Sequence, residues 1–185
     1  MQKLKFSELS YTEIRRKADV FRKRYWGVKP MPLDVELIAE RDFNLAIDIY
    51  HDLNTQFDVL GYIDLSKKKI IIDEHLFEHN VQRSRFTIAH ELGHIILHEQ
   101  IYKTAKISSP DEYNSFRNSF TEDEYDSFEW HANTFAGCLL VPTEILVSEY
   151  KRILKTNGDM SSLTNKFNVS KKALAYRIKK ELDLR

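Results

Sequence analysis

The chain has few of the residues that crosslink or interrupt a polypeptide. Its 185 residues include 5 glycines, 4 prolines and a single cysteine, Cys138. One cysteine cannot form a disulfide within the chain, and Cys138 is flanked by glycine and leucine, so we expect it to be a small buried hydrophobic residue. The scarcity of glycine excludes a glycine-rich phosphate loop, and no serine or cysteine stands in a nucleophile-elbow sequence.

The chain also lacks long apolar runs and an excess of charge of either sign. No stretch approaches the roughly 20 apolar residues that span a bilayer, and the charged residues 1–8 contain no apolar segment typical of a secretory signal. Lysine and arginine total 28, as do aspartate and glutamate, so no overall field directs the chain to nucleic acid or to a membrane. We therefore expect a soluble cytoplasmic protein of one domain, or of one domain with a small appendage.

The most informative stretch that is present is His90-Glu91-Leu92-Gly93-His94, an HExxH sequence. Residues four apart on a helix share a face, so both imidazoles can reach one ion. Glu91 follows the first histidine directly, a position from which its carboxylate can reach a water on that ion. The surrounding isoleucine, leucine and alanine indicate a core helix, in which such polar residues are costly without partners. The alternative is an amphipathic helix with exposed or merely structural histidines.

A catalytic zinc site usually has three protein ligands and one open position, so a third ligand is needed. On an unbroken helix His98 lies about 12 Å from His90 along the axis, too far for one ion with bonds of about 2 Å. We expect His98 to have a structural or supporting role. Glu129 is the better candidate, and Asn133, one turn later on the same face, could accept a hydrogen bond from the free ring nitrogen of His90. The alternative for Glu129 is an exposed helical glutamate.

Hydrophobic periodicity predicts a mixed α+β fold. We expect helices at residues 11–25, 33–40, 81–100, 130–140 and 143–155, and strands at 44–50, 60–65 and 70–72. Residues 66–69, one serine and three lysines, are typical of a hairpin turn. Gly93 is expected to let the 81–100 helix pack closely on the strands. Residues 101–128 are polar and aromatic, and we expect an ordered surface excursion there, with a mobile flap over the site as the alternative.

Several segments together resemble a known family. They are residues 85–94 with 97–98, the pattern Glu129-x-x-Ala132-Asn133-x-Phe135-Ala136, residues 139–142, the strands 61–64 and 70–73, and residues 167–170. This set, which covers about residues 12–180, is similar to the ImmA/IrrE-type metallopeptidases. The chain departs from the family pattern at His131, where a second glutamate is common, and at Val141, where methionine is frequent.

The resemblance implies a zincin-like peptidase core, with a small antiparallel-containing sheet packed on the HExxH helix. It implies that His90, His94 and Glu129 bind the metal and that Glu91 is catalytic. The implied metal is Zn²⁺, although a site of two histidines and one glutamate also accepts Mn or Fe. The implied activity is zinc-dependent endopeptidase cleavage of a helix-turn-helix transcriptional repressor that controls a stress or mobile-element regulon.

Residues 161–185 are expected to form a helical pair that packs on the main domain, residues 1–160. A short helix, a turn at residues 168–170 and a longer helix give this pair a helix-turn-helix outline. The second helix is basic and carries Lys171, Lys172, Arg177, Lys179 and Lys180. A DNA-reading unit is the alternative, but a single such unit on a neutral chain is weak evidence for DNA affinity.

Two other functions are consistent with these residues. The fold could bind a repressor or antitoxin-like partner without cutting it, or it could regulate transcription by binding DNA through the C-terminal helices. For the peptidase, the group that helps the metal to stabilise the oxyanion is left open. Side chains of suitable chemistry are His131, Tyr102, Tyr113 and Tyr125.

Overall fold

The computed structural model describes residues 6–182. Residues 1–5 and 183–185 lie outside the described residues. The first range holds most of residues 1–8, where we expected no secretory signal, and the second ends the expected C-terminal helical pair. The helices are α1 (Tyr11–Tyr25), α2 (Val35–Phe43), α3 (Leu53–Phe57), α4 (Glu74–His79), α5 (Val81–Ala105), α6 (Pro110–Arg117), α7 (Glu122–Leu140), α8 (Thr143–Thr156), α9 (Ser161–Phe167) and α10 (Lys171–Leu182). The strands are β1 (Ala46–Tyr50), β2 (Gly61–Asp64) and β3 (Lys69–Asp73). None of the helices within residues 6–182 is long and apolar enough to cross a bilayer.

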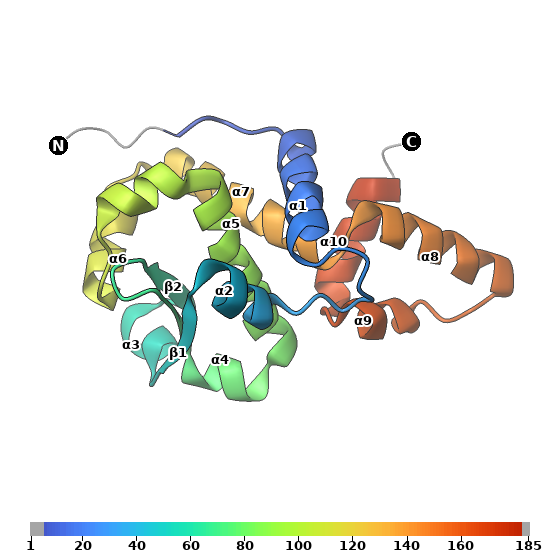
Figure 1. The fold of residues 1–185 in the computed structure, drawn as a ribbon, viewed down its shortest axis with the longest axis horizontal. Coiled ribbons are helices and arrows are strands. Elements are labelled where there is room, and N and C mark those ends of the chain that lie inside the picture. The colour runs from blue at the N-terminus through green and yellow to red at the C-terminus, as the bar shows by residue number, and fades with distance from the viewer. Residues whose placement is uncertain (1–5, 183–185) are drawn as a thin grey trace.

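The three strands form one small mixed sheet (Figure 1). β2 and β3 pair antiparallel, with Gly61 opposite Ile72 and Ile63 opposite Ile70, so the predicted hairpin is confirmed. β1 pairs parallel to β3, and the strand order is β1-β3-β2. The expected α+β fold with a small antiparallel-containing sheet is therefore confirmed.

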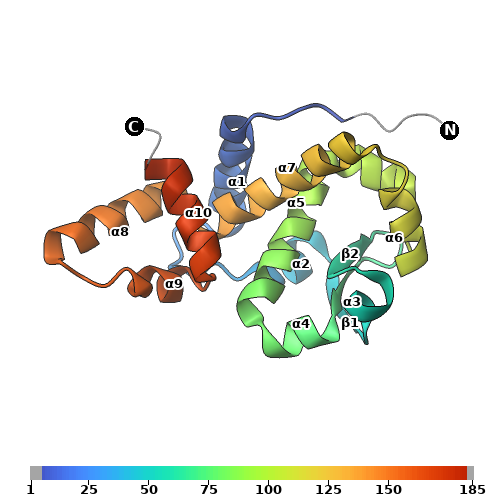
Figure 2. The ribbon, with the colours of Figure 1, turned by 180° about the vertical axis from the view of Figure 1, so that it is seen from behind.

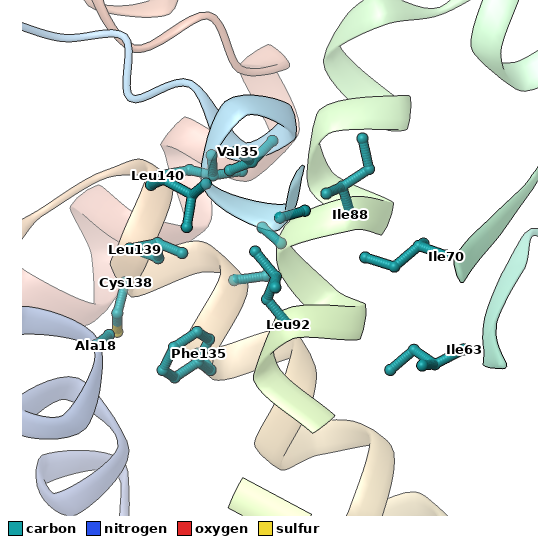
Figure 3. Packing of buried hydrophobic residues seen from close by; sticks show 14 of the residues in the cluster. Ala18, Val35, Ile63, Ile70, Ile88, Leu92, Phe135, Cys138, Leu139 and Leu140 are labelled. Atoms are coloured by element: carbon teal, nitrogen blue, oxygen red, sulfur yellow. The ribbon is translucent and has the colours of Figure 1, made fainter. Parts of the chain in front are cut away.

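The core is built around α5, which lies between the sheet and α7 (Figure 3). Ile88 and Leu92 of α5 are fully buried, as are Ile70 of the sheet and Phe135 of α7. Cys138 lies in the same core, as its apolar neighbours predicted. Because α5 is covered on both flanks, its buried polar residues, among them Glu91, His94 and His98, are held in a largely apolar environment.

Two glycines allow α5 to approach both neighbours closely. A Cβ atom on Gly61 of β2 would lie 2.7 Å from Cγ2 of Thr87 on α5, so no larger residue fits there without movement. A Cβ atom on Gly93 would lie 3.1 Å from Cδ1 of Phe135 and 3.2 Å from the backbone oxygen of Ala132, both on α7. The expectation that Gly93 packs on the strands is therefore wrong, since its open face is turned to α7.

Residues 101–128 are mostly helical, where we expected an ordered surface excursion of unspecified secondary structure. The end of α5, all of α6 and the first part of α7 lie in this segment. Ser109 caps α6 by accepting a hydrogen bond from the Glu112 amide, and Thr121 caps α7 through a capping box with Glu124. The apolar and aromatic side chains of the segment are turned into the core, among them Tyr102, Tyr113, Phe116 and Phe128.

The C-terminal helices α8, α9 and α10 lie on the opposite side of the molecule from the sheet (Figures 1 and 2). Arg177 of α10 is buried and donates hydrogen bonds to the carbonyl oxygen of Val141 at 3.0 and 3.2 Å, to Glu181 at 2.8 Å and to the Tyr11 hydroxyl. Arg15 of α1 pairs with Glu181 at 3.2 Å. This network ties α10 to α1 and to the end of α7, and it makes Arg177 inaccessible to a DNA phosphate.

Candidate metal centre

Two helices bring three candidate ligand side chains together. His90 and His94 project from consecutive turns of α5, and Glu129 projects from α7. Nε2 of His90 lies 2.9 Å from Nε2 of His94, and each of these atoms lies 3.3 Å from an oxygen of Glu129. The three residues form a cluster whose ligand atoms all lie within 4.8 Å of one another. These atoms converge on a single point between the helices.

The spacing of these atoms fits a tetrahedral divalent cation. Bonds of about 2.0–2.1 Å at tetrahedral angles separate ligand atoms by about 3.3 Å, close to the separations of 2.9, 3.3 and 3.3 Å in this cluster. Two imidazole nitrogens that face each other also need a proton or a cation between them. Oε1 of Glu129 is buried, and its approach to His94 lacks hydrogen-bond geometry, so it has no hydrogen-bond partner among the described residues. The donor set therefore matches a metal ion both in spacing and in its unmet bonding capacity.

Asn133 orients the first histidine. Its Oδ1 lies 3.0 Å from Nδ1 of His90, and because an amide oxygen only accepts, Nδ1 carries the hydrogen. Nε2 of the neutral ring then presents its lone pair to the ligand point. Glu129 and Asn133 stand one turn apart on α7, so the same helix face supplies a ligand and the support for another ligand.

The electrostatics of the cluster favour positive charge at its centre. Burial opposes charge on His90, but the adjacent Glu129 carboxylate outweighs it and raises the pKa of His90 to about 9. Burial, together with the charge on His90, lowers the pKa of His94 to about 4. Burial acts against ionisation of Glu129, yet the two histidines hold its pKa well below the usual range. Without a metal the cluster thus holds one proton, and a metal must displace it.

Glu91 lies beside the three ligands on the same helix and is 2 % exposed. Its Oε2 atom has no hydrogen-bond partner among the described residues, and burial raises the pKa of Glu91 to about 7. A Cβ atom built on Gly61 would lie 3.9 Å from Oε1, so the edge of β2 passes directly over this carboxylate. A carboxylate with this pKa can both accept and release a proton near neutral pH.

A cleft of about 330 Å³ gives access to His90, Glu91 and Glu129. Residues just before β2 and at its start form one wall, and α5, α6 and α7 form the others. The lining residues are Asp58, Val59, Leu60, Gly61, Arg83, Phe86, Thr87, His90, Glu91, Tyr113, Arg117, Tyr125, Glu129 and Asn133. Of the four oxyanion candidates, Tyr113 and Tyr125 line the cleft, with their hydroxyl oxygens 3.4 Å apart. Tyr102 and His131 are not among the lining residues.

His98 lies behind His94 rather than at the ligand point. The backbone of His98 is non-helical (φ −131°, ψ 29°), so α5 is kinked at this residue. The helix is therefore not unbroken between His90 and His98, contrary to our assumption. Nδ1 of His98 lies 3.2 Å from Nδ1 of His94, and its Nε2 lies 3.1 Å from Nδ1 of His131. The Leu9 amide donates to Nε2 of His131 at 3.1 Å. Because the Leu9 amide donates to His131, each neutral ring in turn donates toward His94. His98 therefore donates to Nδ1 of His94, whereas Asn133 accepts from Nδ1 of His90.

Sequence reasoning missed the part that His131 plays in this arrangement. His131 is fully buried, and burial lowers its pKa. Its ring links α7 to the segment before α1 through Leu9. The one signal in the sequence was its departure from the family pattern, a histidine where a glutamate is common.

Comparisons with known proteins bear on the family and the fold of the chain. Residues 38–179 match the model of a peptidase family described as the IrrE N-terminal-like domain. No curated protein matches the chain in sequence. Among solved structures, the fold is similar to that of a Mycobacterium tuberculosis transcriptional regulator, with a TM-score of 0.60 and 16% identity over 91% of this chain. The match covers 46% of that regulator, so the present chain spans less than half of its length. Because the family model covers well over half of the chain, the chain belongs to the IrrE N-terminal-like domain family of metallopeptidases.

Proposed function

We propose that the chain is a zinc-dependent endopeptidase that cleaves a helix-turn-helix transcriptional repressor. The observation that carries the proposal is the convergence of His90, His94 and Glu129 on one point beside the buried Glu91. Two imidazoles and a carboxylate that leave one face open are a common ligand set of catalytic zinc. Zinc is preferred to Mn or Fe because of the near-tetrahedral spacing of the ligand atoms.

In this proposal each residue has a distinct part. A bound zinc ion supplies Lewis acidity and lowers the pKa of the attacking water. Glu91 takes a proton from that water at its unpartnered Oε2 and passes it to the nitrogen of the leaving amine. Once a metal replaces the proton of the cluster, Asn133 keeps the remaining ring hydrogen of His90 on Nδ1, so that Nε2 faces the metal. Tyr113 and Tyr125 hold hydroxyl groups in the same cleft, where they can donate to the substrate carbonyl oxygen.

A repressor as substrate is supported by two considerations. The segments that resemble the ImmA/IrrE-type peptidases include both the HExxH helix and the C-terminal helices, and that family is associated with cleavage of such repressors. The Mycobacterium protein with a similar fold is named a transcriptional regulator. Cleavage of a repressor would relieve repression of a stress or mobile-element regulon and would require no DNA contact by this chain.

The test is a cleavage assay with a repressor encoded beside the gene for this chain. Zinc-loaded protein should produce two fragments detectable by mass spectrometry, and a chelator should prevent this. Glu91→Gln should retain zinc but lower the cleavage rate by about 10²–10⁴-fold, because the proton carrier is lost. Glu99→Gln, a change of an exposed glutamate on the same helix, is the matched control and should cleave normally. Normal turnover by Glu91→Gln would refute the mechanism.

A further inference from the structure

A second hollow opens beside the metal cleft, between the first turns of α5, one face of α7 and the start of α10. Figure 2 shows where these three helices lie. We call it the aromatic groove, because Phe86, Trp130 and Tyr176 are among the residues that line it. Its volume is about 660 Å³, against about 330 Å³ for the metal cleft. Trp130 is 38% exposed and Tyr176 46% exposed, so large apolar surface is left uncovered inside a concavity. Such surface is typical of a binding site.

The charge of the aromatic groove has one sign. Arg83 and Lys172 line it, both are exposed, and neither forms an ion pair within residues 6–182. No carboxylate is found among the described residues that line it. Arg177 also contributes to the lining, but its guanidinium is engaged by Val141 and Glu181. The N-terminal end of α10, capped by Ser170, adds partial positive charge at the rim.

The aromatic groove adjoins the metal cleft. Arg83, Phe86 and Asn133 line both hollows. On α7 the lining runs from Glu129 at the metal centre to Gly137 at the far end of the aromatic groove. Eight residues of helix span about 12 Å, and an extended peptide covers about 3.3–3.6 Å per residue. A peptide that runs from the metal into the aromatic groove therefore reaches its end after about three or four residues.

We propose that the aromatic groove is a substrate-recognition site for acidic and aromatic side chains of an extended peptide. These side chains belong three or four residues to one side of the scissile bond. Phe86, Trp130 and Tyr176 pack against the aromatic side chain, and Arg83 and Lys172 pair with the carboxylate. The proposal rests on the peptidase function proposed above, because that function makes a peptide the occupant of the adjoining cleft.

The test uses the full chain with the Glu91→Gln change, so that peptides bind without being cut. The zinc-loaded protein is presented with decapeptides that have a fixed central Ala–Ala pair and random flanks, and bound peptides are identified by mass spectrometry. We expect enrichment of Asp or Glu with Phe, Trp or Tyr at the third and fourth positions on one side. Adding Lys172→Glu should weaken binding of the best peptide at least about fivefold and shift the preference to Lys and Arg. Lys171→Glu is the matched control, since Lys171 precedes Lys172 on α10 but does not line the groove.

Three results would overturn the proposal. The first is that acidic and aromatic residues are not enriched at the third and fourth positions. The second is that the Lys171 and Lys172 variants lose peptide affinity equally. The third is that DNA displaces the bound peptide at a lower concentration than free peptide does. Peptide selection does not depend on turnover. Selection without any cleavage by the parent protein would therefore refute the peptidase function alone, whereas cleavage without selection would refute the aromatic groove alone.

Discussion

Two buried polar clusters border α7, and they differ in how completely their groups are paired. At the end of α7, Arg177 is hydrogen-bonded to Val141, Thr143, Glu181 and Tyr11, and Glu181 is also paired with Arg15. At the metal centre, two histidine nitrogens face each other at 2.9 Å. Carboxylate oxygens of two glutamates, Glu91 and Glu129, have no hydrogen-bond partner among the described residues.

The difference separates a structural cluster from a functional one. A buried charge depends on the partners that the fold supplies, so removal of one partner is costly. A buried cluster with unmet bonding capacity destabilises the chain until something outside the chain occupies it. Both clusters contain buried charge, so burial alone does not identify the site. Unpaired carboxylate oxygens beside two facing histidine nitrogens do.

The largest expected effect breaks the complete cluster. Arg177→Met leaves Glu181 buried without its main partner and should lower the free energy of unfolding by about 3–5 kcal/mol. Urea denaturation followed by circular dichroism measures the loss. Lys179→Met, at an exposed position on the same helix, should change stability by no more than about 0.5 kcal/mol. A loss below about 1 kcal/mol for Arg177→Met would show that the network is not structural.

A smaller effect is expected where a supporting group is removed from the incomplete cluster. Asn133→Ala removes the acceptor for Nδ1 of His90 and should weaken zinc binding by about 10–100-fold. Competition with a chromophoric chelator measures the affinity. The stability of the metal-free protein should change little. Asn165→Ala, at an exposed position on α9, is the control, and an equal loss of affinity in both variants would contradict the orienting role of Asn133.

The smallest expected effect is a loss of folding stability at acidic pH. Burial lowers the pKa of His98 to about 2, below its value of about 6.5 in an unfolded chain. The unfolded chain therefore binds more protons below pH 6.5, so the stability that neutral His98 contributes is present above that pH and is lost as the pH falls. For the metal-free protein we expect a loss of up to about 2 kcal/mol between pH 6.5 and 5 from this residue. His98→Phe should flatten the urea-unfolding profile over this range, and the exposed His79→Phe should not.

Local features of the site could be predicted from the sequence. The four-residue spacings of His90 with His94 and of Glu129 with Asn133 fix which side chains share a helix face. The hairpin of β2 and β3 was also predictable, because its strands are close in the chain. Two helix starts were missed although the sequence carried their signals, namely Ser109 before Pro110 and the Thr121–Glu124 capping box.

Other features depend on contacts that no local pattern encodes. The parallel pairing of β1 with β3 is set by how the intervening chain packs. The hydrogen bond from Leu9 to His131 joins residues 122 positions apart, so no helix or strand periodicity could indicate it. The break in α5 at His98 accompanies hydrogen bonds to His94 and His131 that only the folded chain provides.

Gly61 and Gly93 help to fix the position of the helix that carries His90 and His94. With the strand on one side and α7 on the other at near-contact distance, the HExxH helix has no freedom to slide or rotate between them. The conformational cost of aligning the two imidazoles is thus met while the chain folds, and capture of the cation needs little further ordering. A methyl group at either glycine would force the neighbouring elements apart and would shift the candidate ligands.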